Sequence, residues 1–194
     1  MADLHPMKIK GNWDKGYALD WHIVSSEFIG YNEFGHPQFD TRYTELGELV
    51  YKLKYKHDTT VLDDIVRIIC NFAKYRSIDA IIPVPPSNIS RTSQPVVEIA
   101  KRLGNSLEIQ VFPDAVRKTK NTPEVKNVST PQEKYDILKG VFKVFEPSIK
   151  GKTVLVLDDL YRSGATLRAI TDVLYKQGGV GKVKVLALTM TKRR

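Results

Sequence analysis

The 194-residue sequence has very little cysteine and no long apolar run. Its one cysteine, Cys70, cannot form an internal disulfide, and a single cysteine excludes the Cys-x-x-Cys pattern of a structural zinc module. No apolar stretch approaches the roughly 18 residues that a membrane-spanning helix needs, and the N-terminus lacks a basic-then-apolar signal pattern. We therefore expect a cytoplasmic protein without disulfides, structural zinc or membrane contact.

Acidic residues are also scarce relative to basic ones. Thirty Lys and Arg against 22 Asp and Glu give a formal net charge of +8. Such an excess favours anionic partners such as phosphorylated metabolites or nucleic acid, although a solvated surface explains it more simply. We find no interleaved aromatic and basic residues of the kind that form a stacking groove, so nucleic acid as a partner has little support.

From residue 44 onward, short apolar runs alternate with segments in which apolar residues recur at helical intervals. Helical intervals predict helices over 46–53, 61–72, 95–103, 132–138 and 165–177, whereas apolar runs predict strands over 80–84, 108–112, 141–145, 153–157 and 183–188. Gly104 is expected to end the third helix, and Thr130 with Glu133 forms a capping-box pattern before the fourth. This alternation predicts an α/β fold with a mostly parallel sheet and helices on both of its faces.

The first 43 residues follow a different pattern. Residues 1–12 show no periodicity and predict a frayed arm, residues 17–29 read as strand, and 31–37 read as a turn or loop. We expect a small, hood-like arm and strand extension over 1–43, followed by the main domain over 44–194. A long polar, basic stretch at 113–131 predicts a mobile or functional loop.

Two acidic residues follow the apolar run TVLVL at 153–157. Asp158 and Asp159 therefore fall at the carboxyl end of a predicted strand, where parallel sheets bind ligands. The residues after them lead into a helix whose first N–H groups can converge on one anion. These loop residues are Tyr161, Arg162, Ser163, Gly164, Ala165 and Thr166. The pattern predicts a monophosphate site beside a carboxylate pair, and such a pair needs hydroxyl groups or a divalent cation opposite it.

This segment resembles the signature of type I phosphoribosyltransferases, in which a strand ends in two acids and a small-residue loop grips the 5-phosphate of phosphoribosyl diphosphate. The resemblance implies that Asp158 and Asp159 hold the ribose hydroxyls and contact Mg²⁺ only indirectly, through the substrate. It further implies displacement of magnesium diphosphate from the anomeric carbon by a nitrogen nucleophile. We assign no general base from the sequence.

Two other segments resemble the ComF branch of this family: LKYK at 53–56 and IIPVPPSNISR at 81–91. By that likeness, Pro85, Pro86 and Ser87 belong to a diphosphate loop, and Arg91 is a catalytic cation for the leaving group. Lys118 and Lys120 are candidate cations on a loop that closes over the substrate, and a solvated charge run is an equal alternative for both.

The sequence also departs from this branch. The cysteine-rich zinc module is absent, the run after the PVP motif is RTSQ in place of RGFNQ, and Arg162 stands where 6-oxopurine salvage enzymes carry an acid. Besides a transferase with an unidentified acceptor, two alternatives stay open: a non-catalytic sensor of phosphoribosyl diphosphate and an accessory factor in DNA uptake or processing. A homodimer is a further hypothesis for the assembly of this chain. His22, His36 and His57 are expected to be surface or hydrogen-bonded histidines.

Overall fold

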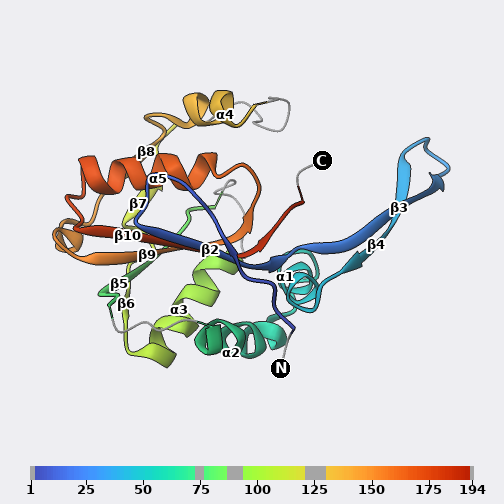
Figure 1. Cartoon of the computed structure of the whole chain (residues 1–194), viewed down its shortest axis with the longest axis horizontal. Helices are drawn as coiled ribbons and strands as arrows, with labels where there is room; N and C mark the ends of the chain where they lie inside the picture. Colours follow the sequence, from blue (N-terminus) through green and yellow to red (C-terminus); the bar gives the residue numbers. More distant parts are fainter. Residues whose placement is uncertain (1–2, 73–76, 87–93, 121–129, 193–194) are drawn as a thin grey trace.

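The computed structural model describes residues 3–72, 77–86, 94–120 and 130–192, and its centre is a six-stranded sheet (Figure 1). The five strands after the first are mutually parallel, and only the edge strand β1 is antiparallel. In sheet order the strands are β1 (Met7–Lys8), β2 (Lys15–Trp21), β10 (Lys182–Met190), β9 (Thr153–Tyr161), β5 (Ala80–Pro83) and β6 (Gln110–Val111). The prediction of a mostly parallel α/β sheet is confirmed.

Helices cover both faces of this sheet. One face carries α1 (Glu45–Tyr55), α2 (Leu62–Phe72) and α3 (Pro95–Leu107), and the other carries α5 (Ala165–Lys176) with α4 (Pro131–Leu138) beyond it (Figure 1). The hairpin β7 (Val116–Lys118) and β8 (Phe142–Val144) lies on the α5 side. Two 3-10 turns complete the described elements, η1 (Thr59–Val61) and η3 (Pro147–Ile149). None of the described helices is both long and apolar enough to cross a bilayer.

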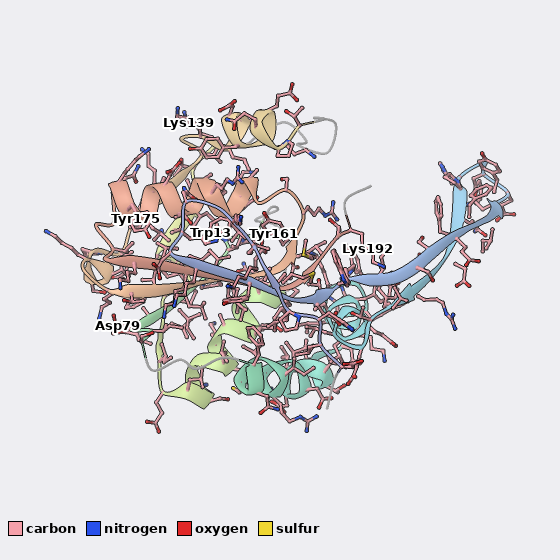
Figure 2. All side chains as sticks on the ribbon, in the orientation of Figure 1. Trp13, Asp79, Lys139, Tyr161, Tyr175 and Lys192 are labelled. Atoms are coloured by element: carbon pink, nitrogen blue, oxygen red, sulfur yellow. The ribbon has the colours of Figure 1, made fainter. Side chains whose placement is uncertain are left out.

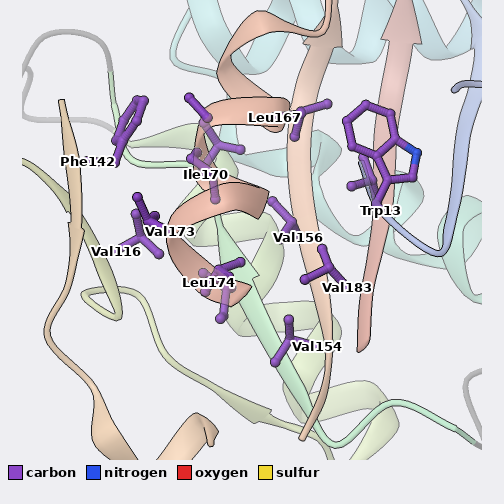
Figure 3. Packing of buried hydrophobic residues seen from close by; sticks show 14 of the residues in the cluster. Trp13, Val116, Phe142, Val154, Val156, Leu167, Ile170, Val173, Leu174 and Val183 are labelled. Carbon is purple, nitrogen blue, oxygen red and sulfur yellow. The ribbon is translucent and has the colours of Figure 1, made fainter. Parts of the chain in front are cut away.

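Strand β9 explains why the sequence reads as an unbroken apolar run. Val154 and Val156 pack toward α5, where Figure 3 shows them facing Ile170 and Leu174. The alternate residues of the strand, which include Leu157, pack into the second core against α1, α2 and α3. A parallel strand that is covered on both faces must be apolar at every position, and TVLVL meets that requirement.

A two-stranded ribbon projects from one end of the sheet (Figure 1). It consists of β3 (Ile23–Tyr31) and β4 (Pro37–Tyr43), which pair antiparallel, and we call residues 23–43 the arm. At its tip, Oδ1 of Asn32 accepts hydrogen bonds from the backbone N–H groups of Phe34 and His36. At its base, Lys192 donates a hydrogen bond to the Val24 carbonyl at 3.0 Å (Figure 2).

Three expectations about local structure are wrong. Residues 7 and 8 form β1, and Trp13 is buried with its indole N–H bonded to the Ile9 carbonyl at 3.0 Å, so residues 7–12 are not part of a frayed arm. The polar stretch 113–131 contains β7, which pairs with β8, so residues 116–118 are not a loop, while residues 121–129 lie outside the described residues. Helix α3 does not end at Gly104 but continues to Leu107. Glycine at position 104 allows β6 to pack closely against the helix, since a Cβ on it would lie 2.2 Å from Cγ2 of Val111.

Gly47 allows α1 to lie against the end of β2. A Cβ at this position would lie 2.0 Å from the His22 carbonyl oxygen. Helix propensity alone predicts that Gly47→Ala stabilises the protein by about 1 kcal/mol. We expect instead a loss of about 1–3 kcal/mol in the free energy of unfolding, measured by urea denaturation, because overlap with backbone cannot be relieved by a rotamer change. Glu48→Ala, at the exposed neighbouring position, is the control, and a stabilised Gly47→Ala protein would contradict the prediction.

Candidate functional site

Asp158 and Asp159 lie within β9, because the strand runs on to Tyr161. The expectation that they follow the strand directly is therefore corrected: β9 and β10 stay paired through Tyr161 and Met190. Successive side chains of a strand point to opposite faces, so the two carboxylates do not point the same way. Asp159 is on the face of α1, and Asp158 is on the face of α5.

An ion pair joins Asp159 to helix α1. Nζ of Lys54 lies 2.6 Å from Oδ2 of Asp159, and the two side chains are only 24% and 13% exposed. Partial burial makes such a pair stronger than an ordinary surface ion pair. Lys54 belongs to the LKYK segment, so this contact places that segment beside the acidic pair.

Among the described residues, the Asp158 carboxyl has no ion-pair partner. Burial raises its pKa to about 7, and the negative charge of Asp159 adds to this rise. Hydrogen bonds from the backbone N–H groups of Asp159 and Leu160, together with the more distant Lys54, act in the opposite direction without cancelling it. In the part of the chain that the structure describes, Lys54 is thus the one ammonium partner of the two carboxylates, and the raised pKa favours the protonated form of Asp158.

The residues after β9 form a tight turn into α5. Gly164 has a φ of +76°, and a Cβ on it would lie 2.7 Å from the Tyr161 hydroxyl, so glycine serves both the backbone conformation and the close packing. Tyr161, labelled in Figure 2, is buried at the end of β9, whereas Arg162 is exposed.

The N-terminus of α5 has no side-chain cap at Gly164, unlike α1 and α4, which Thr44 and Thr130 cap. Within the described residues, the one side-chain acceptor at this end is Oγ of Ser163, which lies at a long 3.4 Å from the Ala165 nitrogen. The first N–H groups of a helix need acceptors, and the helix dipole makes that acceptor preferably an anion. With Thr166 and Ala165 in the first turn, this end of α5 has the donors that a phosphate group requires.

His22 reaches the same edge of the sheet from the end of β2. Its Nδ1 lies 3.0 Å from Oγ1 of Thr189, and that hydroxyl donates to the Asp159 carbonyl at 3.1 Å. Thr189 has one hydroxyl hydrogen and a carbonyl can only accept, so Nδ1 of His22 must be the donor. Nε2 of His22 therefore carries a free lone pair. Burial lowers the His22 pKa, and Lys54 and Arg162 lower it further against the opposing effect of Asp159.

His22 could not be selected as a site residue from the pattern of residues around it. Its place after β2 is a signal that could have been used, because parallel strands bring their carboxyl ends to one edge. That signal requires knowing that β2 is parallel to β10, and β2 precedes β10 by more than 160 residues.

Aromatic and basic residues alternate along the last turns of α1, but they are not arranged as a stacking groove. Tyr43, Tyr51 and Tyr55 form a row with ring centroids 4.9 and 5.2 Å apart, interleaved in sequence with Lys52 and Lys54. Tyr43 and Tyr51 stack on each other, so no base can enter between them. The row packs the base of the arm against α1.

The structure describes some of the other predicted site residues and not others. Val84 donates to the Leu157 carbonyl at 2.8 Å, so Pro85 and Pro86 follow β5 at the edge where Asp158 lies. Ser87 and Arg91 lie outside the described residues. Lys118 is in β7 and Lys120 follows it, and among the described residues no hydrogen bond or ion pair connects either to the acidic pair. Within the same residues, no group of three or more His, Cys, Asp or Glu side chains could hold a metal ion.

A parallel α/β sheet with carboxylates and a helix N-terminus without a side-chain cap at one edge has the features of a protein that binds a phosphorylated ligand. Comparison with protein families makes this specific: the model of the phosphoribosyl transferase domain matches residues 54–193. The chain belongs to this family. No curated protein matches it.

Solved structures with a similar arrangement include two adenine phosphoribosyltransferases. The enzyme from Leishmania donovani is 13% identical, with 96% of this chain and 86% of that chain covered and a TM-score of 0.49. The enzyme from Thermoanaerobacter pseudethanolicus is 12% identical, with 87% and 95% covered and a TM-score of 0.47. A hypothetical protein from Neisseria gonorrhoeae with bound ppGpp is 19% identical, with 72% and 70% covered and a TM-score of 0.42. All three scores are below 0.5, so the family assignment depends on the family model.

The arrangement around Thr189 predicts the tautomer of His22. Long-range ¹⁵N NMR should find hydrogen on Nδ1, none on Nε2, and a pKa below the ordinary 6.5. Thr189→Val removes the acceptor of the Nδ1 hydrogen and should abolish the preference for this tautomer, while the exposed His36 is an internal reference. Hydrogen on Nε2 in the wild type would contradict the deduced network.

The raised pKa of Asp158 predicts a pH-dependent stability. An aspartate has its ordinary pKa of 3.8 in the unfolded chain and about 7 here, so its contribution to stability is fully present below about pH 4 and is lost as pH rises to about 7. Asp158→Asn keeps an acceptor for the Asp159 N–H but does not titrate. The melting temperature of the variant relative to wild type should therefore increase between pH 4 and pH 8. Parallel curves would show that Asp158 titrates normally.

Proposed function

We propose that this protein binds phosphoribosyl diphosphate with Mg²⁺ at the edge formed by Asp158, Asp159 and the N-terminus of α5, and transfers ribose 5-phosphate to a nitrogen acceptor. The observation that carries this proposal is the juxtaposition of a helix N-terminus without a side-chain cap and a carboxylate pair that, among the described residues, has one ammonium partner. The first feature suits a phosphate group, and the second suits sugar hydroxyls with a cation nearby. A sugar phosphate has both groups in one molecule.

The donor set is compatible with Mg²⁺ that arrives with substrate. Mg²⁺ usually keeps several waters and is held largely by substrate phosphates, so Asp158 and Asp159, which lie on opposite faces of β9, would contact the ion only through the substrate. When bound, the ion would neutralise the leaving diphosphate. Lys54 already neutralises part of the charge on Asp159, which favours a hydroxyl-binding role for that residue.

In the proposed reaction, the acceptor nitrogen forms a bond to the anomeric carbon while the bond from that carbon to diphosphate breaks. Diphosphate leaves with the bonding electrons, and positive charge develops on the sugar, where the carboxylates can stabilise it. The proton on the acceptor nitrogen must pass to a base, and we assign this role to Nε2 of His22. A hydrogen found on Nε2 would remove His22 from it.

Within the family, we favour the ComF-like branch. The LKYK and PVP segments support this, because Lys54 of the first contacts Asp159 and the strand of the second ends beside Leu157. Pro85, Pro86 and Ser87 would then face the diphosphate, with Arg91, Lys118 and Lys120 as cations for it.

Calorimetric titration of phosphoribosyl diphosphate with Mg²⁺ tests the proposal. We expect Asp158→Asn/Asp159→Asn to weaken binding by about a hundredfold or more, since two charge-assisted contacts are lost. The control is Asp14→Asn/Asp114→Asn, which makes the same charge change at two exposed positions outside the acidic pair. Equal loss in both variants, or no binding by wild type, would refute the site.

Phosphorus NMR of the same samples separates an enzyme from a sensor. Diphosphate release on addition of nitrogenous bases or amines, lost in the Asp158→Asn/Asp159→Asn variant, would establish transfer. Binding without release would refute transfer under those conditions and favour the non-catalytic sensor.

A further inference from the structure

The arm has more exposed apolar surface than its position explains. Phe28, Ile29, Tyr31 and Phe34 are 53%, 63%, 70% and 76% exposed, and Phe39 of the opposite strand is 48% exposed. Phe28 contacts both Tyr31 and Phe39 edge to face, so these three rings form one cluster on the ribbon. Contiguous exposed aromatic groups of this kind are typical of interaction surfaces.

The backbone of the arm is also incompletely paired. In the described part of the chain β3 and β4 pair only with each other, so each has one outer edge without a neighbouring strand. Two-stranded ribbons are marginally stable alone, and open edges readily accept another strand. A partner that adds a strand would satisfy both requirements.

The charges on the arm restrict what that partner can be. Glu27 lies directly opposite Asp40, a like-charge pair that destabilises the ribbon, while Arg42 lies opposite Ser25. None of these three charged residues has an ion pair within the described residues. The outer edge of β4 therefore needs a cation beside Asp40 and an anion beside Arg42.

A second copy of β4 meets this need in one antiparallel register. When the two-fold axis passes through Thr41, Asp40 of each copy lies opposite Arg42 of the other, and Phe39 lies opposite Tyr43. Moving the axis to Asp40 would set Asp40 against itself, and moving it to Arg42 would set Arg42 against itself. Glu27 is the only charge on β3, so the outer edge of β3 offers no such match.

We propose that the arm is a homodimerisation element in which β4 of two copies pair antiparallel about Thr41, forming a four-stranded sheet in the order β3, β4, β4, β3. Because Thr41 is close to the base of the arm, the tip of each arm extends past the base of the other. The exposed aromatic residues of the tip then lie toward the body of the second copy. This proposal is independent of the proposed catalytic function.

A charge exchange on the full-length chain tests the register. Sedimentation equilibrium at low ionic strength should show a dimer for wild type and a dissociation constant about tenfold weaker or more for Asp40→Arg and for Arg42→Asp, because each single change sets like charges opposite each other twice. The double variant Asp40→Arg/Arg42→Asp restores opposite charges and should restore the dimer.

Folding of the variants is checked by circular dichroism. Asp40→Arg places opposite charges across the ribbon from Glu27, so it should not lower the melting temperature of the protein even while it weakens the dimer. A monomeric wild type would overturn the proposal and leave the arm to a different partner. A wild-type dimer that neither single change weakens would overturn it too, because the dimer would then form elsewhere.

Discussion

Strand β9 lies in the middle of a sheet that is covered by helices on both faces, and this constraint organises the rest of the molecule. The strand can contain only apolar residues for as long as the cover lasts, and polar ones become tolerable where it ends. That change falls between Leu157 and Asp158. The same backbone continues in register with β10 to Tyr161, so the polar residues are held as rigidly as the apolar ones before them. A loop would not fix two carboxylates with comparable precision.

The charges at this edge are not balanced among the described residues, where one ammonium group lies beside two carboxylates. Lys54 pairs with Asp159. Protonation of Asp158 reduces the free-energy cost of burying its carboxylate beside Asp159, which is why its pKa is raised. A buried carboxyl with a pKa near neutrality is frequent at functional sites, although structural networks produce it too. The uncapped N-terminus of α5 adds a second unmet requirement, this time for an anion. One ligand that brings hydroxyl groups or a cation to the carboxylates and an anion to the helix would satisfy both.

The elements that could be predicted from sequence are those in which the pattern of side chains along the segment is enough to specify a helix or a strand. Helix α5 and the apolar part of β9 show a clear period and a long apolar run, and the Thr130 capping box is confirmed together with its helix. Strands β1 and β7 could not be predicted, because each is two or three residues long and is fixed by pairing with a partner. The extension of β9 through the acidic pair was missed for the same reason: hydrogen bonding to β10 maintains it where the apolar pattern stops.

The candidate site shows the same division. The acidic pair and the glycine turn are contiguous in sequence, so local chemistry was enough to select them. Lys54 is 105 residues from Asp159, and His22 is 167 residues from Thr189; only the fold brings these partners together. Long-range contacts of this kind require the strand order to be known, and the strand order depends on β2 joining β10 at the far side of the sheet.

The strands of the arm, unlike β9, are not enclosed by neighbouring strands and helices. Every strand of the main sheet except its outermost ones has neighbours on both sides, whereas β3 and β4 have only each other and no covering helix along most of their length. Natural proteins protect open edges by twisting, charging or covering them, and here the charges of β4 form a pattern that matches its own reverse. A like-charge pair such as Glu27 and Asp40 is costly in an isolated ribbon, and a cation supplied from outside offsets this cost. The sequence of the arm is thus easier to explain as half of a larger sheet than as a complete structure.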